Sequence, residues 1–382
     1  MIVNFYRLVQ AKLPLLLVAI LPLGGYACST LQPDSSSQGD AASEVVLATS
    51  SLVAVEGRSF AGSRDGSISI AYPGTALHFS ATAKKVFLRA HSSGNEQYLD
   101  VLKDGERVQK VRLYSGMQEI LLWESSKSDK GVNPMDFEVI RASAPWQGTL
   151  ELISVRVEGG SFVQTAALPM RKLLFIGDSI TSGSVSDPET PDQGKSLSNN
   201  NGRFSYGRLT SRLLQAQAHL VSYGGRGLIR DWEGKDNSMT NNAPVFYPRA
   251  HPDDPSKLWD HSRYQADGIV VNLGTNDLNS GVPDFETFVT AYTDFVQQIR
   301  SDYPQAHIFL MLSPMHSVNS SQRKALSEFI SATIERLDDS QVSMLDVSYY
   351  PGRRVDPHPV KEEHAAMANE IAPIIAETLG WD

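Results

Sequence analysis

The chain has 382 residues, of which 41% are hydrophobic and 20% charged, and its formal net charge is −9. This length is enough for two domains, and the composition is that of a globular protein rather than a fibrous or wholly disordered one. The acidic balance and the lack of a basic stripe argue against nucleic acid as a partner.

Residues 1–27 predict an export signal. Arg7 and Lys12 accompany a short apolar run, Leu13–Leu23, and small residues follow it. A membrane span needs about 20 apolar residues, so this run favours a cleaved signal over an uncleaved anchor, which is the alternative. Removal of the signal would take away two basic residues and no acidic one, leaving a net charge of −11.

Cys28 is the only cysteine, so a disulfide within the chain is excluded. It follows Gly25–Ala27, where a bacterial lipoprotein carries its lipid-modified cysteine, although the bulky Tyr26 departs from that pattern. Ser29 resembles the outer-membrane-sorted type, and residues 28–43 predict a flexible polar tether. We expect export to the bacterial cell envelope, with a lipid anchor in the outer membrane or periplasm. An incidental cysteine in a secreted protein is the alternative.

Residues 44–165 predict an all-β domain. Eight short segments are rich in β-branched or aromatic residues, and Gly, Ser and Asp turns separate them. This spacing indicates a β-sandwich or jelly roll, and Asp104-Gly105 predicts a hairpin turn. The predicted strands are Ser67–Tyr72, Ala76–Ala81, Lys85–His91, Gln97–Leu102, Glu106–Leu113, Glu119–Trp123, Met135–Ile140 and Leu150–Val157.

Residues 166–382 predict a three-layer α/β domain, because apolar strand runs alternate with helical segments. Continuous apolar strands are buried on both faces, which favours a parallel five-stranded sheet with right-handed crossovers. Ligands of such sheets bind beyond the carboxyl ends of the strands. The predicted strands are Leu173–Ile176, His219–Tyr223, Gly268–Leu273, His307–Leu312 and Val342–Val347; the predicted helices are Ser205–Gln217, Phe285–Arg300, Gln322–Leu337 and Lys361–Leu379.

Three short blocks follow these strands. Gly177–Thr181 (GDSIT) places Ser179 at a strand-to-helix turn, where its hydroxyl would project above the sheet, although Ser is also a common helix N-cap. Gly224–Gly227 permits close backbone approach, but such loops are also ordinary turns. Gly274–Asp277 (GTND) offers the Asn276 amide, which suits an oxyanion but is also typical of turns.

A fourth block, Asp356-Pro357-His358-Pro359, precedes the last helix. In an extended chain, residues two apart point the same way, so Asp356 and His358 can share a face. Asp356 would then orient His358 and stabilise its imidazolium, as a serine triad requires. A capping Asp and a surface His are the alternative.

Together, in this order, the blocks resemble the SGNH/GDSL hydrolase superfamily over residues 172–381. The resemblance implies a flavodoxin-like domain with Ser179 as nucleophile, His358 as general base and Asp356 as its orienting carboxylate. It implies an oxyanion site made by the N–H groups of Ser179 and Gly225 and the side chain of Asn276. It also implies that neither a cofactor nor a metal is needed.

A sandwich followed by such a domain resembles carbohydrate esterase family two, whose members deacetylate xylan and other plant polysaccharides. The single residue between Asp356 and His358 also matches that family, but relatives often have an aromatic there instead of Pro357. The implied substrate is an acetylated carbohydrate; a lipid or aryl esterase and a non-catalytic surface glycan-binding lipoprotein are the alternatives. Three further stretches carry the resemblance: Ala144–Gly160, Gly225–Asp231 and Trp259–Asn276.

Four aromatic residues fall in loops expected around the site: Tyr223, Trp232, Tyr247 and Trp259. Tyr223 and Trp259 are the predicted substrate-binding residues, because aromatic rings stack on sugar faces, with a core position as the alternative for each.

Among the other histidines, His364 is expected on a helix surface. His251, His261 and His316 are candidates to approach the cleft without a convincing carboxylate partner, and no metal-ligand spacing is apparent. The pattern does not fix an oligomeric state.

Overall fold

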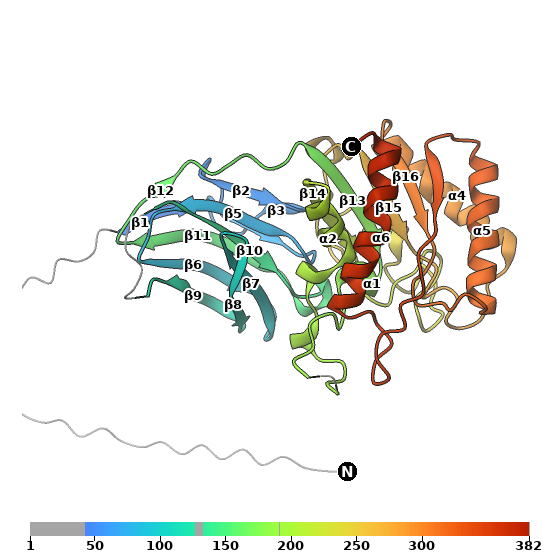
Figure 1. Cartoon of the computed structure of the whole chain (residues 1–382), viewed down its shortest axis with the longest axis horizontal. Coiled ribbons are helices and arrows are strands. Elements are labelled where there is room, and N and C mark those ends of the chain that lie inside the picture. The colour runs from blue at the N-terminus through green and yellow to red at the C-terminus, as the bar shows by residue number, and fades with distance from the viewer. Residues whose placement is uncertain (1–42, 127–132, 191, 382) are drawn as a thin grey trace, which may run out of the picture. The chain divides into compact units, whose positions relative to one another are not determined.

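The structure is a computed structural model, and it describes residues 43–126, 133–190 and 192–381, which belong to one compact unit. The predicted export signal, Cys28 and most of the predicted tether lie outside the described residues. Two antiparallel sheets come first along the chain, and a parallel sheet with helices follows (Figure 1). None of the described helices is long and apolar enough to cross a membrane.

Two six-stranded antiparallel sheets form the predicted sandwich. The first has the order β3 (Ser59–Ala61), β4 (Ile68–Ile70), β11 (Leu150–Glu158), β6 (Lys85–Ser92) and β9 (Gly116–Glu124), with β1 (Ser43–Leu47) paired to β11. The second has the order β12 (Phe162–Val163), β5 (Ala76–Ala81), β10 (Met135–Arg141), β7 (Gln97–Lys103) and β8 (Glu106–Leu113), with β2 (Val53–Glu56) paired to β5.

The sandwich core lies between the two sheets, because alternate side chains of each strand point inward. Phe79 and Phe137 stack at 5.2 Å in the second sheet, and Val155 of the first sheet belongs to the same buried cluster. The predicted hairpin is confirmed, with positive φ at Asp104 and Gly105. All eight predicted strands are present; β1, β2, β3 and β12 were missed because two to five residues carry little periodic signal.

The second half of the chain forms a parallel five-stranded sheet in the order β14 (Ala216–Ser222), β13 (Arg171–Gly177), β15 (Gly268–Asn272), β16 (His307–Met311) and β17 (Val342–Leu345). The helices are α1 (Ser179–Ser182), α2 (Tyr206–Leu213), α3 (Ala243–Phe246), α4 (Phe285–Asp302), α5 (Ser321–Leu337) and α6 (Lys361–Leu379). Short 3₁₀ turns are η1 (Pro145–Gln147), η2 (Leu197–Asn199), η3 (Gly202–Phe204) and η4 (His261–Arg263).

Successive side chains of the central strands enter two different cores. Leu174 and Ile176 of β13 pack in a cluster with α4 and α5, whereas Leu173 and Phe175 pack in a cluster with α2 and α6. Helices therefore cover both faces of the sheet, as Figure 1 shows. The predicted three-layer α/β architecture after a sandwich is confirmed.

Helix α2 is shorter than predicted. It ends at Leu213, Gln215 adopts a left-handed φ of 51°, and β14 begins at Ala216. The pairing of Ala216 and Gln217 with β13 draws these residues into the sheet, which overrides their helical pattern. The predicted division of the chain at residue 165 falls between β12 and β13, and as a domain boundary it stays a prediction.

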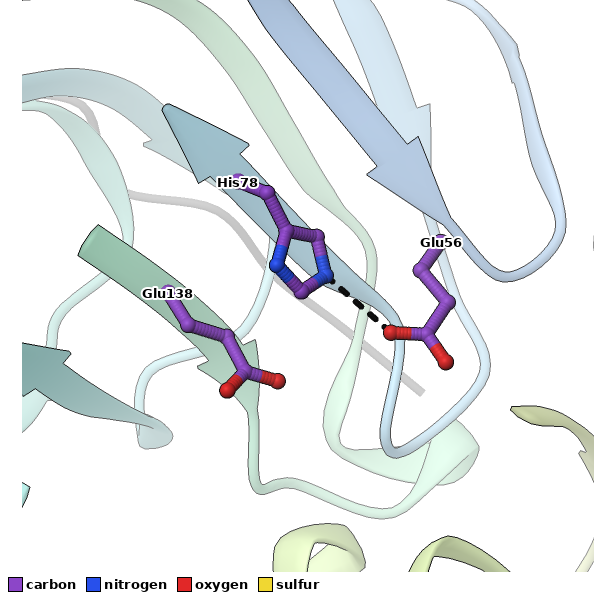
Figure 2. Close-up of side chains that lie close together, drawn as sticks. All are labelled: Glu56, His78 and Glu138. Carbon is purple, nitrogen blue, oxygen red and sulfur yellow. Dashed lines mark hydrogen bonds and ion pairs between the residues drawn. The ribbon is translucent and has the colours of Figure 1, made fainter. Parts of the chain in front are cut away.

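Buried charges link the sandwich to the α/β layers. Arg208 of α2 contacts Glu138 of β10 and lies 3.3 Å from Glu56 of β2, and Glu56 also accepts the N–H of Ala218 at 2.6 Å. Figure 2 shows His78 facing Glu56, with Glu138 alongside; His78 Nε2 lies 3.0 Å from Glu56. Burial by itself would raise the pKa of Glu56, but Arg208 and His78 lower it to about 2.

Candidate active site

The structure brings Ser179 and His358 together from distant parts of the chain. Ser179 Oγ lies 2.9 Å from His358 Nε2, and His358 Nδ1 lies 2.6 Å from Asp356 Oδ1. With its proton on Nδ1, the imidazole leaves a lone pair on Nε2 for the proton of the Ser179 hydroxyl. The three predicted residues therefore form one continuous chain of hydrogen-bonding distances.

Ser179 owes its position to a tight turn between β13 and α1. A Cβ at Gly177 would lie 2.2 Å from Thr181 Oγ1 and 3.0 Å from the Asn272 carbonyl oxygen, so the turn requires glycine. Asp178 caps the helix, because its side chain accepts the Ile180 N–H at 2.9 Å. The turn leaves Ser179 at the carboxyl edge of the parallel sheet.

Asp356 binds His358 through a single carboxylate oxygen. Asp356 Oδ1 accepts the backbone N–H of His358 at 3.1 Å as well as facing the ring nitrogen. Partial burial acts to raise the pKa of Asp356, but the hydrogen bond and charge of His358 outweigh it, so the pKa is lowered. The carboxylate is therefore ionised where an imidazolium needs stabilising.

Two backbone donors are available beside Ser179. Within the described residues, the N–H groups of Ser179 and Gly225 donate to no protein acceptor. Gly225 has a φ of 80°, which favours glycine, and it lines the pocket beside Ser179. These are two of the three predicted oxyanion donors.

Asn276 is placed differently from the other two predicted donors. Its Nδ2 donates to Asp178 Oδ2 at 3.0 Å and to the Arg226 carbonyl oxygen at 2.9 Å. An amide nitrogen has two hydrogens, and both are used in these contacts. Asn276 lines the pocket, but it must release one partner before it can donate to an oxyanion.

Two buried carboxylates organise the turns around these donors. Asp277 accepts the N–H groups of Leu228, Ile229 and Arg230. Burial raises the pKa of Asp277 despite these bonds, and burial raises the pKa of Asp178 to about 7.

A pocket of about 340 Å³ opens over the nucleophile. This volume is near the lower end of the ~300–1,000 Å³ typical of ligand sites. A hollow of about 420 Å³ exists elsewhere, beside Glu56 and Arg208, and neither Ser179 nor His358 lines it. The smaller pocket is therefore the candidate site, and residues lining it include Ser179, His358, Gly225, Asn276, Trp146 and Trp232.

Comparison with known proteins assigns this arrangement to a family. The model of the GDSL-like lipase/acylhydrolase family matches residues 175–378. An acetylxylan esterase/glucomannan deacetylase of Cellvibrio japonicus is 33% identical over 371 residues, which cover 96% of this chain and 99% of that protein. The chain belongs to carbohydrate esterase family two.

The solved structures agree with this assignment. A family two carbohydrate esterase from Cellvibrio japonicus superimposes with a TM-score of 0.83 at 33% identity, covering 89% of this chain and 99% of that one. A family two esterase from Clostridium thermocellum, solved with cellohexaose, shares the fold with a TM-score of 0.78 at 24% identity, covering 86% of this chain and 100% of that one. The chain is an SGNH-type ester hydrolase.

The predicted substrate-binding aromatics of this esterase need correction. Tyr223 and Trp259 are each 6% exposed, belong to the hydrophobic core, and do not line the pocket. Both residues lie outside the helices and strands, which is why they were predicted to contact substrate. Their rings instead pack in the hydrophobic core, and Tyr247 is fully buried in the same cluster. Trp232 does line the pocket.

Trp146 lines the pocket from the sandwich, and sequence reasoning missed it. Trp146 lies in the Ala144–Gly160 stretch that carries the family resemblance, but nothing in the sequence tells which turn of the sandwich meets the other domain. Lys195 also lines the pocket, and it was missed because it lies between α1 and α2, outside the four sequence blocks.

His364 is buried, not at a helix surface as predicted. It is 0% exposed, and its Nδ1 accepts the Tyr206 N–H at 3.2 Å. Burial lowers the pKa of His364 to about 3, so this histidine stays neutral. The helical spacing of His364 with Met367 and Ile371, both core residues, was the signal that could have placed it.

The other three candidate histidines do not line the pocket. His251 contacts Thr149, His261 contacts Tyr303, and His316 is half-buried.

One group in the described part of the esterase could offer three ligand atoms to a metal: Glu56, His78 and Glu138 (Figure 2). These atoms lie within 4.8 Å of one another, but the Arg208 guanidinium already contacts both carboxylates. A metal ion would have to displace this cation, so the residues fit an ion-pair cluster better than a metal centre.

Proposed function

We propose that the esterase removes O-acetyl groups from an acetylated polysaccharide or oligosaccharide, such as xylan or mannan, through an acyl-enzyme intermediate. The observation that carries the proposal is the continuous chain from Ser179 through His358 to Asp356, at 2.9 and 2.6 Å, at the floor of the pocket. A nucleophile, a base and an orienting carboxylate in this geometry perform acyl transfer.

In the first half-reaction, Ser179 Oγ attacks the acetyl carbonyl carbon while its proton passes to His358 Nε2. The negative charge that develops on the carbonyl oxygen is met by the N–H groups of Ser179 and Gly225. The bond to the sugar oxygen then breaks, and that oxygen takes the proton from His358. Asp356 stabilises the transient imidazolium.

In the second half-reaction, water attacks the acetyl carbonyl on Ser179 and gives its proton to His358. The tetrahedral intermediate collapses, the bond to Ser179 Oγ breaks, and the proton returns from His358 to the serine. The sum is one ester and one water converted to one sugar hydroxyl and one acetic acid.

Two observations favour a carbohydrate ester over a lipid ester. A relative that is 33% identical to this chain is an acetylxylan esterase/glucomannan deacetylase, and a family two relative was solved with cellohexaose. The pocket lining also includes Lys195 and Asn279, whose polar groups can form hydrogen bonds with sugar hydroxyls.

The assignment of the nucleophile is tested by Ser179→Ala. We expect this variant to lose hydrolysis of 4-nitrophenyl acetate by roughly 10⁶-fold and to lose labelling by a fluorophosphonate. Ser238→Ala, a change of an exposed serine outside the pocket, is the matched control and should behave like the wild type. Labelling of folded Ser179→Ala protein would refute the assignment.

The substrate class is tested by measuring acetate release from acetylated xylan and acetylated glucomannan, beside hydrolysis of phosphatidylcholine and of 4-nitrophenyl palmitate. We expect release from at least one polysaccharide and none from the lipid substrates. The opposite pattern would favour the lipid esterase alternative. Binding of glycans without any hydrolysis would favour a non-catalytic glycan-binding protein.

We also propose export and lipid attachment at Cys28, which follows a basic, apolar and then small-residue segment. A fatty acid on this cysteine would hold the esterase at the cell envelope. Expression of Cys28→Ser should move the protein from the membrane fraction to the soluble fraction. Unchanged retention would contradict the anchor.

A further inference from the structure

Trp146 is an exposed aromatic residue in an otherwise buried segment. Residues 141–145 and Gln147 are all buried, whereas the Trp146 side chain is 44% exposed and lines the pocket over Ser179. Large apolar side chains exposed at a concave site are characteristic of ligand contacts. The position of this indole follows from the 3₁₀ turn η1, which joins β10 to β11.

The side chain of Gln147 holds this turn in place. Its Oε1 accepts the Ala144 N–H at 2.9 Å and the Asn200 amide at 3.2 Å, and its Nε2 donates to the Glu96 carbonyl oxygen at 3.0 Å. Ala144 and Glu96 belong to the sandwich, and Asn200 belongs to the α/β half of the chain. Gln147 therefore fixes the turn to both halves at once.

Arg141 supports the same turn from below. It is fully buried, and it donates to the carbonyl oxygens of Ala144 and Gly148 and to the side chain of Gln97. These acceptors are all neutral, and burial lowers the pKa of Arg141 to about 9. A buried cation needs hydrogen-bond acceptors, because it has lost its hydration, and the carbonyl groups of the turn supply them. These charge-assisted hydrogen bonds hold the turn in place.

A second indole lines the same pocket from the α/β half. Trp232 is 54% exposed, and its ring lies against Gly225, where an added Cβ would come within 2.9 Å of Trp232 Cδ1. Each half of the chain thus presents one exposed indole to a pocket whose floor holds Ser179.

We propose that Trp146 is a specificity-determining residue, which binds a sugar ring of the acetylated substrate, so that the sandwich completes the carbohydrate site. This inference rests on the proposed function. The C–H face of a pyranose packs on an aromatic ring, and an indole gives the largest such face. Because Gln147 and Arg141 hold the turn that carries this indole, little backbone freedom is lost on binding, and the contact favours oligosaccharides over small aryl esters.

The kinetic test compares Trp146→Ala with the wild type on acetylated xylo- and manno-oligosaccharides and on 4-nitrophenyl acetate. We expect the KM for the oligosaccharides to rise about tenfold, with kcat and the activity on 4-nitrophenyl acetate changed less than about twofold. Trp146→Phe should recover part of the loss. Tyr114→Ala, which removes an exposed sandwich aromatic outside the pocket, should have no effect.

An unchanged KM for the oligosaccharides in Trp146→Ala would overturn the proposal. Equal losses on both kinds of substrate would also overturn it, because they would mean that Trp146 only maintains the turn. A binding measurement separates this result from failure of the proposed function. In a Ser179→Ala background, titration calorimetry with the same oligosaccharides should show weaker binding when Trp146→Ala is added, whether or not the wild type releases acetate.

Discussion

A buried carboxylate, Asp277, helps to hold the loop that carries Gly225, and removal of this carboxylate gives a sharp test. Asp277 is 0% exposed and accepts the N–H groups of Leu228 at 2.9 and 3.0 Å, Ile229 at 2.8 Å and Arg230 at 3.2 Å. Asp277→Ala removes the acceptor of all three groups. The Asp277 side chain contacts neither Ser179 nor His358.

The magnitude follows from the number of donors left without a partner. A buried N–H group without an acceptor costs about 1–3 kcal/mol, so three of them would cost about 3–9 kcal/mol. Water that enters the vacated space would satisfy some of them, so we expect a loss near the lower end, about 3 kcal/mol. Release of the loop also displaces the Gly225 N–H, and loss of one oxyanion donor lowers kcat by ~10²–10³-fold.

The assay is urea denaturation of the wild type, Asp277→Ala and Asp277→Asn, with kcat on 4-nitrophenyl acetate measured for each. Asp277→Asn keeps one acceptor oxygen but places an amide donor among backbone donors, so its loss should be smaller than that of Asp277→Ala. A free energy of unfolding within about 1 kcal/mol of the wild type, with kcat unchanged in Asp277→Ala, would refute the reasoning.

Two further predictions concern buried charges. Burial raises the pKa of Asp178 from 3.8 to about 7, so the native state binds this proton more tightly than the unfolded chain, and stability falls as pH rises from about 4 to about 7. Asp178→Asn should remove this slope, worth at most about 4 kcal/mol, in urea midpoints measured across that range; parallel curves for the two proteins would contradict it. Arg208→Met removes the cation that Glu56 and Glu138 share, and it should lower the free energy of unfolding by about 3–5 kcal/mol, with part recovered on adding Glu56→Gln. An unchanged denaturation midpoint would count against that role for Arg208.

The spacing of hydrophobic residues predicted the strands and helices whose buried side chains recur at regular intervals. Strand β5 and helix α6 have the bounds that their apolar spacing predicted, because each presents a repeating face to a core. Pattern failed at Gln215, where the chain leaves α2 for β14, because pairing with β13 decides that boundary. It also failed for the short edge strands of the sandwich, which contain too few residues to show a period.

The sequence by itself determined which residues can react. Ser179, His358 and Asp356 lie in short blocks whose residue types and order carry the chemistry, and adjacent glycines mark the turns that the backbone requires. These features are local, since a turn or a two-residue spacing is set by neighbouring dihedral angles.

Only the tertiary structure decided which side chains surround the reacting atoms. Tyr223 and Trp259 turn into the core, His364 lies on the buried face of α6, Asn276 is engaged by Asp178, and Trp146 reaches the pocket from the other half of the chain. An aromatic ring or an amide is equally suited to a core and to a cleft. Its place depends on contacts between segments far apart along the chain, and no local pattern records these contacts.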